Sequence, residues 1–330
     1  MRRTPLVLAA AATGAAVVAR RRQREPGTWP VLDARTTTAT ADDGTVLHVE
    51  ISGPAEATGT VVLAHGYVLS NRLWDQQVAA LTTARPDLRV VTYDQRGHGQ
   101  SARAPKDSAT IEQLGKDLAA VIDQLATGPV VVVGHSMGGM TIMSYVEQHA
   151  PEVGPRVVGA GLVATSSGGL NDLTFGLPAA ASAKLRVAIP AGMEQARRWE
   201  DAGRKPLPQP FLRPVLFGKA ARSADVRRTF EVLSACSAHT VADFFETFTT
   251  HDRLAALAAL SGVPVTILIG THDRLCPIAM SHAMADALPH ARLRVYPGAG
   301  HMLQLERADE VSAELVALVS AIPARSLAAV

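Results

Sequence analysis

The segment GHSMG, residues 134–138, places a serine between two glycines directly after an apolar run at 130–133. A serine hydroxyl acts as a nucleophile when a base removes its proton and a tight strand-to-helix turn lifts it clear of the backbone. Such a turn requires small neighbours, and Gly134 and Gly138 stand two residues to either side of Ser136. The pattern therefore predicts a nucleophile at Ser136, and an ordinary structural turn is the alternative.

A carboxylate that orients the base is expected at Asp273. A reactive serine needs a base and an acid that holds the base, and in strand–turn–helix arrangements the acid follows the serine along the chain. Asp273 lies in the segment 271–277, directly after an apolar run at 265–270 that is typical of a buried strand. It would then emerge at the same sheet edge as Ser136. The alternative is an acid in the middle of the chain, such as Asp172.

The base is expected at His301, one of eleven histidines. His301 closes the segment PGAGH, residues 297–301, after the last expected strand at 293–296. Position decides the choice, because ligands of an open α/β sheet bind beyond the carboxyl ends of its strands. Three other histidines are interpreted as loop or surface residues: His135, His272 and His282. The sequence thus predicts a triad of Ser136, Asp273 and His301.

The same chemistry needs two N–H groups that stabilise an oxyanion. One is expected from the backbone of Met137, the residue after the serine. The other is expected from the loop after a strand at 60–65, where Gly66 lets the backbone turn closely and the N–H of Tyr67 is the natural donor. His65 is of a type that could do catalysis, but a role in holding this loop by hydrogen bonds is favoured.

Short β-rich runs alternate with helical patterns from residue 45 onward. The expected strands are 45–51, 60–65, 89–93, 130–134, 157–164, 265–270 and 293–296. Several are apolar throughout, as strands are when helices cover both faces of the sheet. Apolar residues at helical spacing predict helices between them, for example at 72–84, 110–126 and 302–322. The alternation predicts an α/β fold with a mostly parallel, doubly wound sheet flanked by helices.

The alternation lapses between residues 166 and 261. This interval contains a proline-rich piece at 205–214 and several helical patterns, so we interpret it as an inserted helical cap. The core would then comprise residues 40–165 and 262–330. The aromatic residues of the cap are expected to form mainly its own core, with the lining of a pocket as the alternative: Trp199, Phe211, Phe217, Phe230, Phe244, Phe245 and Phe248.

The charge of the chain is unevenly distributed. The first 25 residues hold six arginines and one glutamate, which leaves the rest at −3 because the whole chain carries +2. This body has no broad basic stripe, which argues against nucleic acid as a partner. The two cysteines are too few for a disulfide framework or a metal cluster.

Residues 1–25 are predicted to be a hydrophobic segment with basic flanks, followed by a linker at 26–39. As a helix, the uncharged stretch 4–19 would reach about 24 Å, somewhat less than the roughly 30 Å of a bilayer core. We expect it to associate with a membrane or anchor in it, and the arginines after it favour a cytoplasmic body. A secretory signal, with export of the protein, is the alternative.

Together these motifs resemble the α/β-hydrolase superfamily, in the branch of serine esterases, lipases, cofactor-free haloperoxidases and carbon–carbon bond hydrolases. The matching segments are VVLAHGY (61–67), YDQRGHGQS (93–101), VVVVGHSMGG (130–139), GTHDRLCP (270–277) and PGAGHMLQLERADEV (297–311). The resemblance implies an eight-stranded sheet, whereas the pattern indicates seven strands. It also implies that residues 94–99 form a structural loop. A serine at position 136 disfavours the epoxide hydrolases and dehalogenases, which carry aspartate there.

The first functional hypothesis is a serine hydrolase that cleaves carboxylic esters through an acyl-enzyme. Its partner would be a small-molecule ester of small to medium size and apolar character, and no metal or organic cofactor is expected. Cleavage of a thioester, lactone or carbon–carbon bond, or perhydrolysis, is the alternative on the same triad. An alternative of another class is a non-catalytic ligand-binding protein on a hydrolase scaffold. The sequence predicts no oligomeric state.

Overall fold

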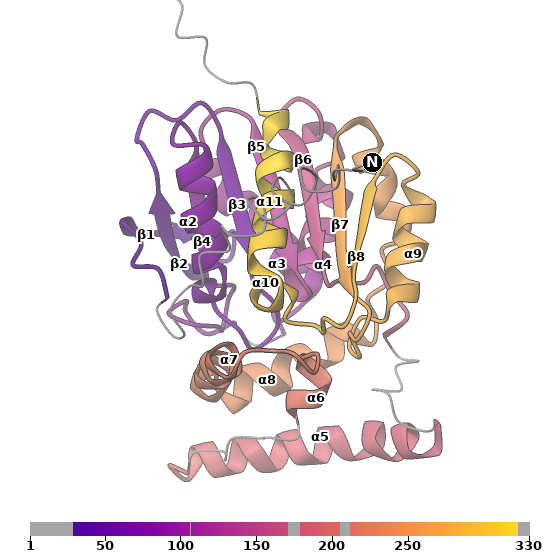
Figure 1. The fold of residues 1–330 in the computed structure, drawn as a ribbon. Helices are drawn as coiled ribbons and strands as arrows, with labels where there is room; N and C mark the ends of the chain where they lie inside the picture. The colour runs from indigo at the N-terminus through magenta and orange to yellow at the C-terminus, as the bar shows by residue number, and fades with distance from the viewer. Residues whose placement is uncertain (1–28, 106, 171–178, 205–211, 323–330) are drawn as a thin grey trace, which may run out of the picture.

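A single eight-stranded sheet forms the centre of the computed structural model, which describes residues 29–105, 107–170, 179–204 and 212–322 (Figure 1). The strands are β1 (Ala34–Thr40), β2 (Val46–Ser52), β3 (Thr60–Ala64), β4 (Arg89–Tyr93), β5 (Val130–His135), β6 (Val157–Val163), β7 (Val265–Gly270) and β8 (Arg292–Tyr296). Their spatial order is β1-β2-β4-β3-β5-β6-β7-β8. β2 pairs antiparallel with β1 and β4, and all other neighbours are parallel. The predicted mostly parallel, doubly wound α/β sheet is therefore confirmed.

Helices cover both faces of this sheet. The core helices are η1 (Asn71–Trp74), α2 (Asp75–Ala84), α3 (Ile111–Leu125), α4 (Met137–Gln148), η2 (Ala150–Glu152), η6 (Ala255–Gly262), α9 (Ile278–Ala287), α10 (Leu303–Glu306), α11 (Ala308–Leu318) and η7 (Val319–Ala321). Buried side chains of α3, α4 and α9 pack on one face, whereas those of α2 and α11 pack on the other (Figure 1).

The run of four valines before the candidate serine is explained by this sandwich. Val130 and Val132 belong to the core cluster on the α3–α4 face, and Val131 and Val133 belong to the cluster on the α2–α11 face. Burial of each such side chain contributes about 1.5–3 kcal/mol to the stability of the fold. The central strand β5 is thus fixed firmly on both sides, which holds the residues at its carboxyl end in place.

The eighth strand is β1, which the sequence pattern did not reveal. It spans Ala34–Thr40, so the prediction of a linker at 26–39 is wrong for most of its second half. β1 is an antiparallel edge strand of the sequence ARTTTAT, and Ala39 is its one buried residue. Without an apolar alternation, only the β propensity of its threonines indicated a strand.

Helices also form the part of the chain expected as a cap. Between β6 and η6 the described residues include α5 (Ala179–Asp201), α6 (Arg213–Leu216), α7 (Ser223–Ala235), α8 (Ala238–Phe245) and η5 (Glu246–Phe248). They lie beyond the carboxyl ends of the parallel strands (Figure 1). η6 returns to the core before the expected boundary at 261, because Leu257 and Leu260 pack in the same cluster as α3 and α4.

The N-terminal segment, residues 1–25 with its apolar stretch 4–19, lies outside the described residues. Across the ranges that are described, none of the helices combines the length and apolar character needed to cross a bilayer. The expected helix at 302–322 is divided into α10, α11 and η7, with a break at Arg307.

Candidate active site

Ser136 stands in the turn between β5 and α4. Its backbone angles, φ 52° and ψ −117°, lie in a region that costs a residue with a side chain of the order of 1–3 kcal/mol. The turn needs its glycines, because a Cβ on Gly134 would lie 2.2 Å from the carbonyl oxygen of Gly138. A Cβ on Gly138 would lie 2.2 Å from the carbonyl oxygen of Ala64. Close backbone packing therefore holds Ser136 in a strained, partly exposed position at the sheet edge.

Two further contacts stabilise this turn. The backbone N–H of Ser136 donates to the carbonyl of Val163 at the end of β6 (2.9 Å). Its own carbonyl accepts a hydrogen bond from the hydroxyl of Thr165 (2.7 Å). The partners lie at the end of β6 and two residues beyond it, so the pairing of β5 with β6 sets the position of the serine.

Asp273 and His301 lie side by side at the same edge of the sheet. Nδ1 of His301 is 2.8 Å from Oδ2 of Asp273, and both side chains are almost completely buried. The other carboxylate oxygen, Oδ1, accepts the backbone N–H groups of Leu275 (2.9 Å) and Cys276 (2.8 Å). Because an ionised carboxylate only accepts hydrogen bonds, Nδ1 carries the proton and Nε2 remains the basic nitrogen. The rival acid, Asp172, lies outside the described residues.

His135 connects the serine turn to His301. Its Nε2 is 2.9 Å from the carbonyl oxygen of His301, and the two imidazole rings have centroids 4.9 Å apart. The ring is fully buried, so the expectation of a loop or surface residue is wrong for His135. Burial, and in second place the charge of His301, lowers the pKa of His135 well below its usual value. His272 and His282 are exposed, as expected.

The loop after β3 approaches the serine from the other side. A Cβ on Gly66 would lie 2.8 Å from Nδ1 of His135, so only glycine lets the loop pass this close. Val68, two residues on, has a φ of 59°, which marks a second tight turn. Tyr67 is held between them, and its phenol donates a hydrogen bond to the carbonyl of Val241 in the cap. Met137 opens α4, and the first N–H groups of a helix have no partner within the helix.

His65 is a member of the scaffold under this loop. Its Nε2 accepts the backbone N–H of Gln95 (2.9 Å), so Nδ1 carries the proton and donates it to the carbonyl of Gly66 (2.7 Å). Burial lowers the pKa of His65 to about 4, which keeps the ring neutral. The side chain of Gln95 also donates to the carbonyl of His65 (2.6 Å) and accepts from the hydroxyl of Thr141 (2.7 Å). Gln95, in the loop 94–99 that was expected to be structural, thus joins the loop after β3 to helix α4.

The fold and these contacts agree with a comparison to known families. A family model described as "Alpha/beta hydrolase family" matches residues 61–314. The chain belongs to this family.

Individual relatives of this α/β hydrolase carry several activities in their names. It is 30% identical to a non-heme haloperoxidase of Rhodococcus erythropolis, over 85% of this chain and 98% of that protein. It is 27% identical to a bifunctional esterase/perhydrolase of Acinetobacter calcoaceticus, over 85% of this chain and 98% of that protein. The crystal structure of an enol-lactonase from Burkholderia xenovorans superposes with a TM-score of 0.67 at 27% identity, covering 86% of this chain and 100% of that one.

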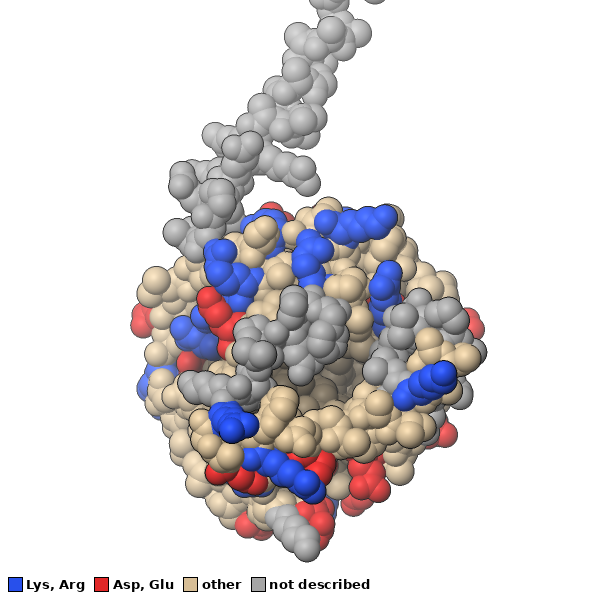
Figure 2. Space-filling view, turned by 90° about the horizontal axis from the view of Figure 1, so that it is seen from below, with Lys and Arg blue, Asp and Glu red and all other residues tan. Residues whose placement is uncertain are grey.

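The cap of this α/β hydrolase packs directly on the loops around Ser136. Phe217 is buried among Leu69, Leu73 and Met302, whereas Phe244 packs with Met137. Figure 2 views the molecule from the cap side and shows this face hollowed near its centre, with uncharged residues at the floor of the hollow. Phe248 also packs in the cluster of Met137, whereas Trp199 is exposed and Phe211 lies outside the described residues.

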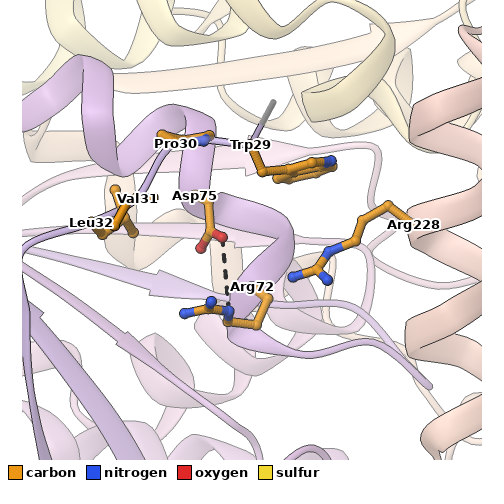
Figure 3. Close-up of a pocket in the computed structure, with 7 residues that line it drawn as sticks. All are labelled: Trp29, Pro30, Val31, Leu32, Arg72, Asp75 and Arg228. Atoms are coloured by element: carbon orange, nitrogen blue, oxygen red, sulfur yellow. Dashed lines mark ion pairs between the residues drawn. The ribbon is translucent and has the colours of Figure 1, made fainter. Parts of the chain in front are cut away.

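A further pocket lies next to the cluster that contains Phe217, because its lining residue Trp29 packs against that cluster (Figure 3). It has a volume of about 340 Å³ and is lined by Trp29, Pro30, Val31, Leu32, Arg72, Asp75 and Arg228. Burial raises the pKa of Asp75 to about 6, and the ion pair with Arg72 at 3.8 Å offsets this only in part. Neither Ser136 nor His301 lines this pocket, so it is not where the serine chemistry would occur. Over the described part of the chain, no group of three or more His, Cys, Asp and Glu side chains is arranged to hold a metal ion.

Proposed function

We propose that this α/β hydrolase is a serine hydrolase that cleaves carboxylic esters of small to medium, apolar substrates through an acyl-enzyme. The observation that carries the proposal is the buried hydrogen bond between His301 Nδ1 and Asp273 Oδ2, at the same sheet edge as the strained turn of Ser136. The name of the esterase/perhydrolase relative supports the same class of substrate.

In the first step, Ser136 Oγ would attack the ester carbonyl while Nε2 of His301 removes its proton. Asp273 holds the imidazole through Nδ1 and stabilises it when it becomes charged. The N–H groups of Met137 and Tyr67 would stabilise the oxyanion that forms. Removal of one such N–H donor lowers kcat by about 10²–10³-fold in enzymes that use an oxyanion hole.

In the second step, protonated His301 would give its proton to the leaving alcohol oxygen as the tetrahedral intermediate collapses. The acyl group then remains on Ser136. His301 next removes a proton from a water molecule, which attacks the acyl carbonyl. The bond between the acyl carbon and Ser136 Oγ then breaks, His301 returns the proton to Oγ, and the carboxylic acid leaves. By covering the site, the cap would limit the access of bulk water to these charged intermediates, which would strengthen the interactions that stabilise them.

Perhydrolysis and lactone cleavage on the same residues form the second candidate function. The names of the haloperoxidase, the esterase/perhydrolase and the enol-lactonase among the relatives favour it. In perhydrolysis, hydrogen peroxide replaces water in the second step and the product is a peracid. Assays of the purified protein with p-nitrophenyl esters, lactones, and an ester plus peroxide would rank these reactions by kcat/KM.

Replacement of the serine tests the proposal directly. The variant Ser136→Ala is expected to lose at least about 10³-fold in kcat on p-nitrophenyl acetate and butyrate, because the acyl-enzyme cannot form. A fluorophosphonate probe should label the wild-type protein and leave Ser136→Ala unlabelled. Ser234→Ala, at an exposed position on α7, is the matched control and should keep both activity and labelling.

Wild-type turnover by Ser136→Ala would refute the proposal. A wild-type protein that neither hydrolyses esters nor reacts with the probe would instead favour a ligand-binding protein on this scaffold.

A further inference from the structure

Glu306, the last residue of α10, holds two chain segments that are far apart in the sequence. Its Oε1 accepts the backbone N–H of Gly300 (2.8 Å), and its Oε2 accepts the backbone N–H of Gly218 (2.9 Å). Gly300 directly precedes His301, whereas Gly218 belongs to the cap, after α6. One carboxylate thus bridges the cap and the loop that carries the candidate base.

The two segments lie in direct backbone contact around this carboxylate. A Cβ on Gly218 would lie 1.9 Å from the carbonyl oxygen of Gly298, and a Cβ on Gly300 would lie 2.6 Å from the nitrogen of Gly218. A third hydrogen bond joins the N–H of Met302 to the carbonyl of Leu216 (3.0 Å). At Gly218 and Gly300, the backbone of the cap segment 216–218 therefore lies directly against the backbone of the loop 298–302.

The bridge requires a carboxylate. An ionised carboxylate offers acceptor sites on both oxygens, whereas a carboxamide of the same shape accepts on one atom and donates on the other. In Glu306→Gln, the side-chain NH₂ group would therefore point at one of the two backbone N–H groups. Two donors would then face each other, and that hydrogen bond would be lost. Glu306 is partly buried, so the N–H that lost its partner would not be fully compensated by water.

The same loop is held on its other side by His135. The carbonyl of His301 accepts from His135 Nε2, while the N–H of the preceding residue, Gly300, is bound by Glu306. These two contacts fix the peptide groups 299–300 and 301–302, on either side of the peptide bond that joins Gly300 to His301. Movement of Glu306 would thus be transmitted to the imidazole of His301 through a single residue.

We propose that Glu306 is a positioning residue, which couples the seating of the cap segment 216–218 to the placement of the His301 imidazole. The inference rests on the proposed function, in which His301 is the base. With the segment seated, both carboxylate oxygens are engaged and the His301 loop is fixed. When the segment lifts, Glu306 keeps only Gly300 and Met302 loses its acceptor, so the base is aligned only when the cap is seated over the site.

The variant Glu306→Gln tests this coupling by hydrogen exchange. Exchange at the amides of segments 212–222 and 296–303 is expected to accelerate together, by at least about fivefold, because one broken bridge frees both segments. The matched control is Glu310→Gln, a neighbouring and exposed glutamate on α11, which should leave both segments unchanged. Acceleration in only one segment, or in neither, would contradict the coupling.

Kinetics separate positioning from a merely structural role. Glu306→Gln is expected to lower kcat per active site by about 10–100-fold with KM within about threefold, because a misplacement of about 1 Å can cost about 10²-fold in rate. Active sites are counted with the fluorophosphonate probe. A structural role would instead reduce the number of titratable sites and leave kcat per site unchanged, and that result would overturn the proposal.

A measurement on the wild-type protein keeps the proposal testable if Glu306→Gln does not fold. The amides of Gly218 and Met302 lose their acceptors in the same opening, so they should exchange with the same protection factor, after correction for their intrinsic rates. Protection factors that differ by more than tenfold would rule out a shared opening. Hydrogen exchange does not depend on activity. Full turnover by Ser136→Ala would therefore overturn the proposed function, whereas the exchange data alone would decide whether the cap segment and the His301 loop are coupled.

Discussion

His301 is held through its backbone as well as through its ring. Asp273 binds Nδ1 of the imidazole, whereas His135 binds the carbonyl of His301 at 2.9 Å. His135 also sets the distance to the loop after β3, because its Nδ1 lies where a side chain on Gly66 would be. The histidine before the serine therefore contributes to the position of three separate loops.

Replacement of His135 by phenylalanine should slow the chemical step. His135→Phe keeps an aromatic ring and loses the hydrogen bond to His301, and a neutral hydrogen bond contributes about 0.5–1.5 kcal/mol, or about 2–10-fold in rate. We expect kcat per titrated site to fall by that factor while KM stays within about twofold. His135→Gln, which can still donate an N–H, should recover part of the loss. Equal kcat values for the wild type and His135→Phe would contradict a positioning role.

The sequence predicted Ser136, Asp273 and His301 because each follows an expected strand, and the strands before the first two are apolar. Strand ends share one sheet edge, so position along the chain was enough to select them from the other serines, acids and histidines. The burial of His135 could not be predicted in this way. It depends on a contact with a residue 166 positions away, and nothing in the local pattern encodes that contact.

At the scale of elements, the junction of β5 and α4 depends on close backbone approach. Gly138, at the second position of α4, passes so near to Ala64 in β3 that a Cβ would meet its carbonyl oxygen at 2.2 Å. The neighbour is backbone in a central strand and cannot move aside. The helix thus begins where it does because a glycine allows it to touch the sheet.

Substitution of this glycine should damage both stability and the site. Gly138→Ala is expected to reduce the free energy of unfolding by about 1–3 kcal/mol or more, because overpacking shifts the backbone. Gly192→Ala in α5 is a matched control: a Cβ there meets no atom within 4 Å, so the change should stabilise the helix by about 0.5–1 kcal/mol. Thermal unfolding and probe labelling would be compared. Unchanged stability and labelling in Gly138→Ala would show that the junction tolerates a side chain.

Element boundaries were harder to predict than the elements themselves. The helical pattern over 302–322 is interrupted at Arg307, because α10 ends where Glu306 turns towards the cap and α11 then follows the sheet. Similarly, β1 lies at the sheet edge, where the backbone groups on one side have no neighbouring strand. Polar side chains on such an edge discourage pairing with another chain, which is consistent with the few apolar residues of β1. Both features arise from tertiary contacts, and local periodicity does not report them.

For the whole molecule, the arrangement of cap on core rests on contacts between distant segments. The hydroxyl of Thr240 donates to the carbonyl of Gly97 (2.8 Å), and Glu306 binds Gly218 at a separation of 88 residues. The sequence indicated that the interval was helical, but its packing depends on such pairs. This is why a cap could be predicted and its contacts could not.

The free energy of unfolding depends on pH through two kinds of carboxylate, those whose pKa is lowered by folding and those whose pKa is raised by it. Asp43 and Asp87 are hydrogen-bonded to Arg96 and Arg85, which hold their pKa values well below the usual range. These groups favour the folded state above the unfolded pKa, and their contribution is lost on acidification. Asp75 has the opposite sign. Burial raises its pKa to about 6 in the folded state, so the folded protein binds this proton more tightly than the unfolded chain does.

The charge on Asp75 should therefore destabilise the protein at neutral pH. Its unfavourable contribution develops as pH rises from about 4 to about 6, and the gap between an unfolded pKa of 3.8 and a folded pKa of about 6 corresponds to at most about 3 kcal/mol. Asp75→Asn should thus raise the free energy of unfolding by about 1–3 kcal/mol at pH 7.5, and by much less at pH 4. Denaturant titrations at both pH values would measure this, with the exposed Asp33→Asn as control. Because Asp43 and Asp87 titrate equally in both proteins, the difference between variant and wild type isolates Asp75. An equal effect of the substitution at both pH values would mean that packing or the ion pair with Arg72, and not desolvation of the charge, governs this residue.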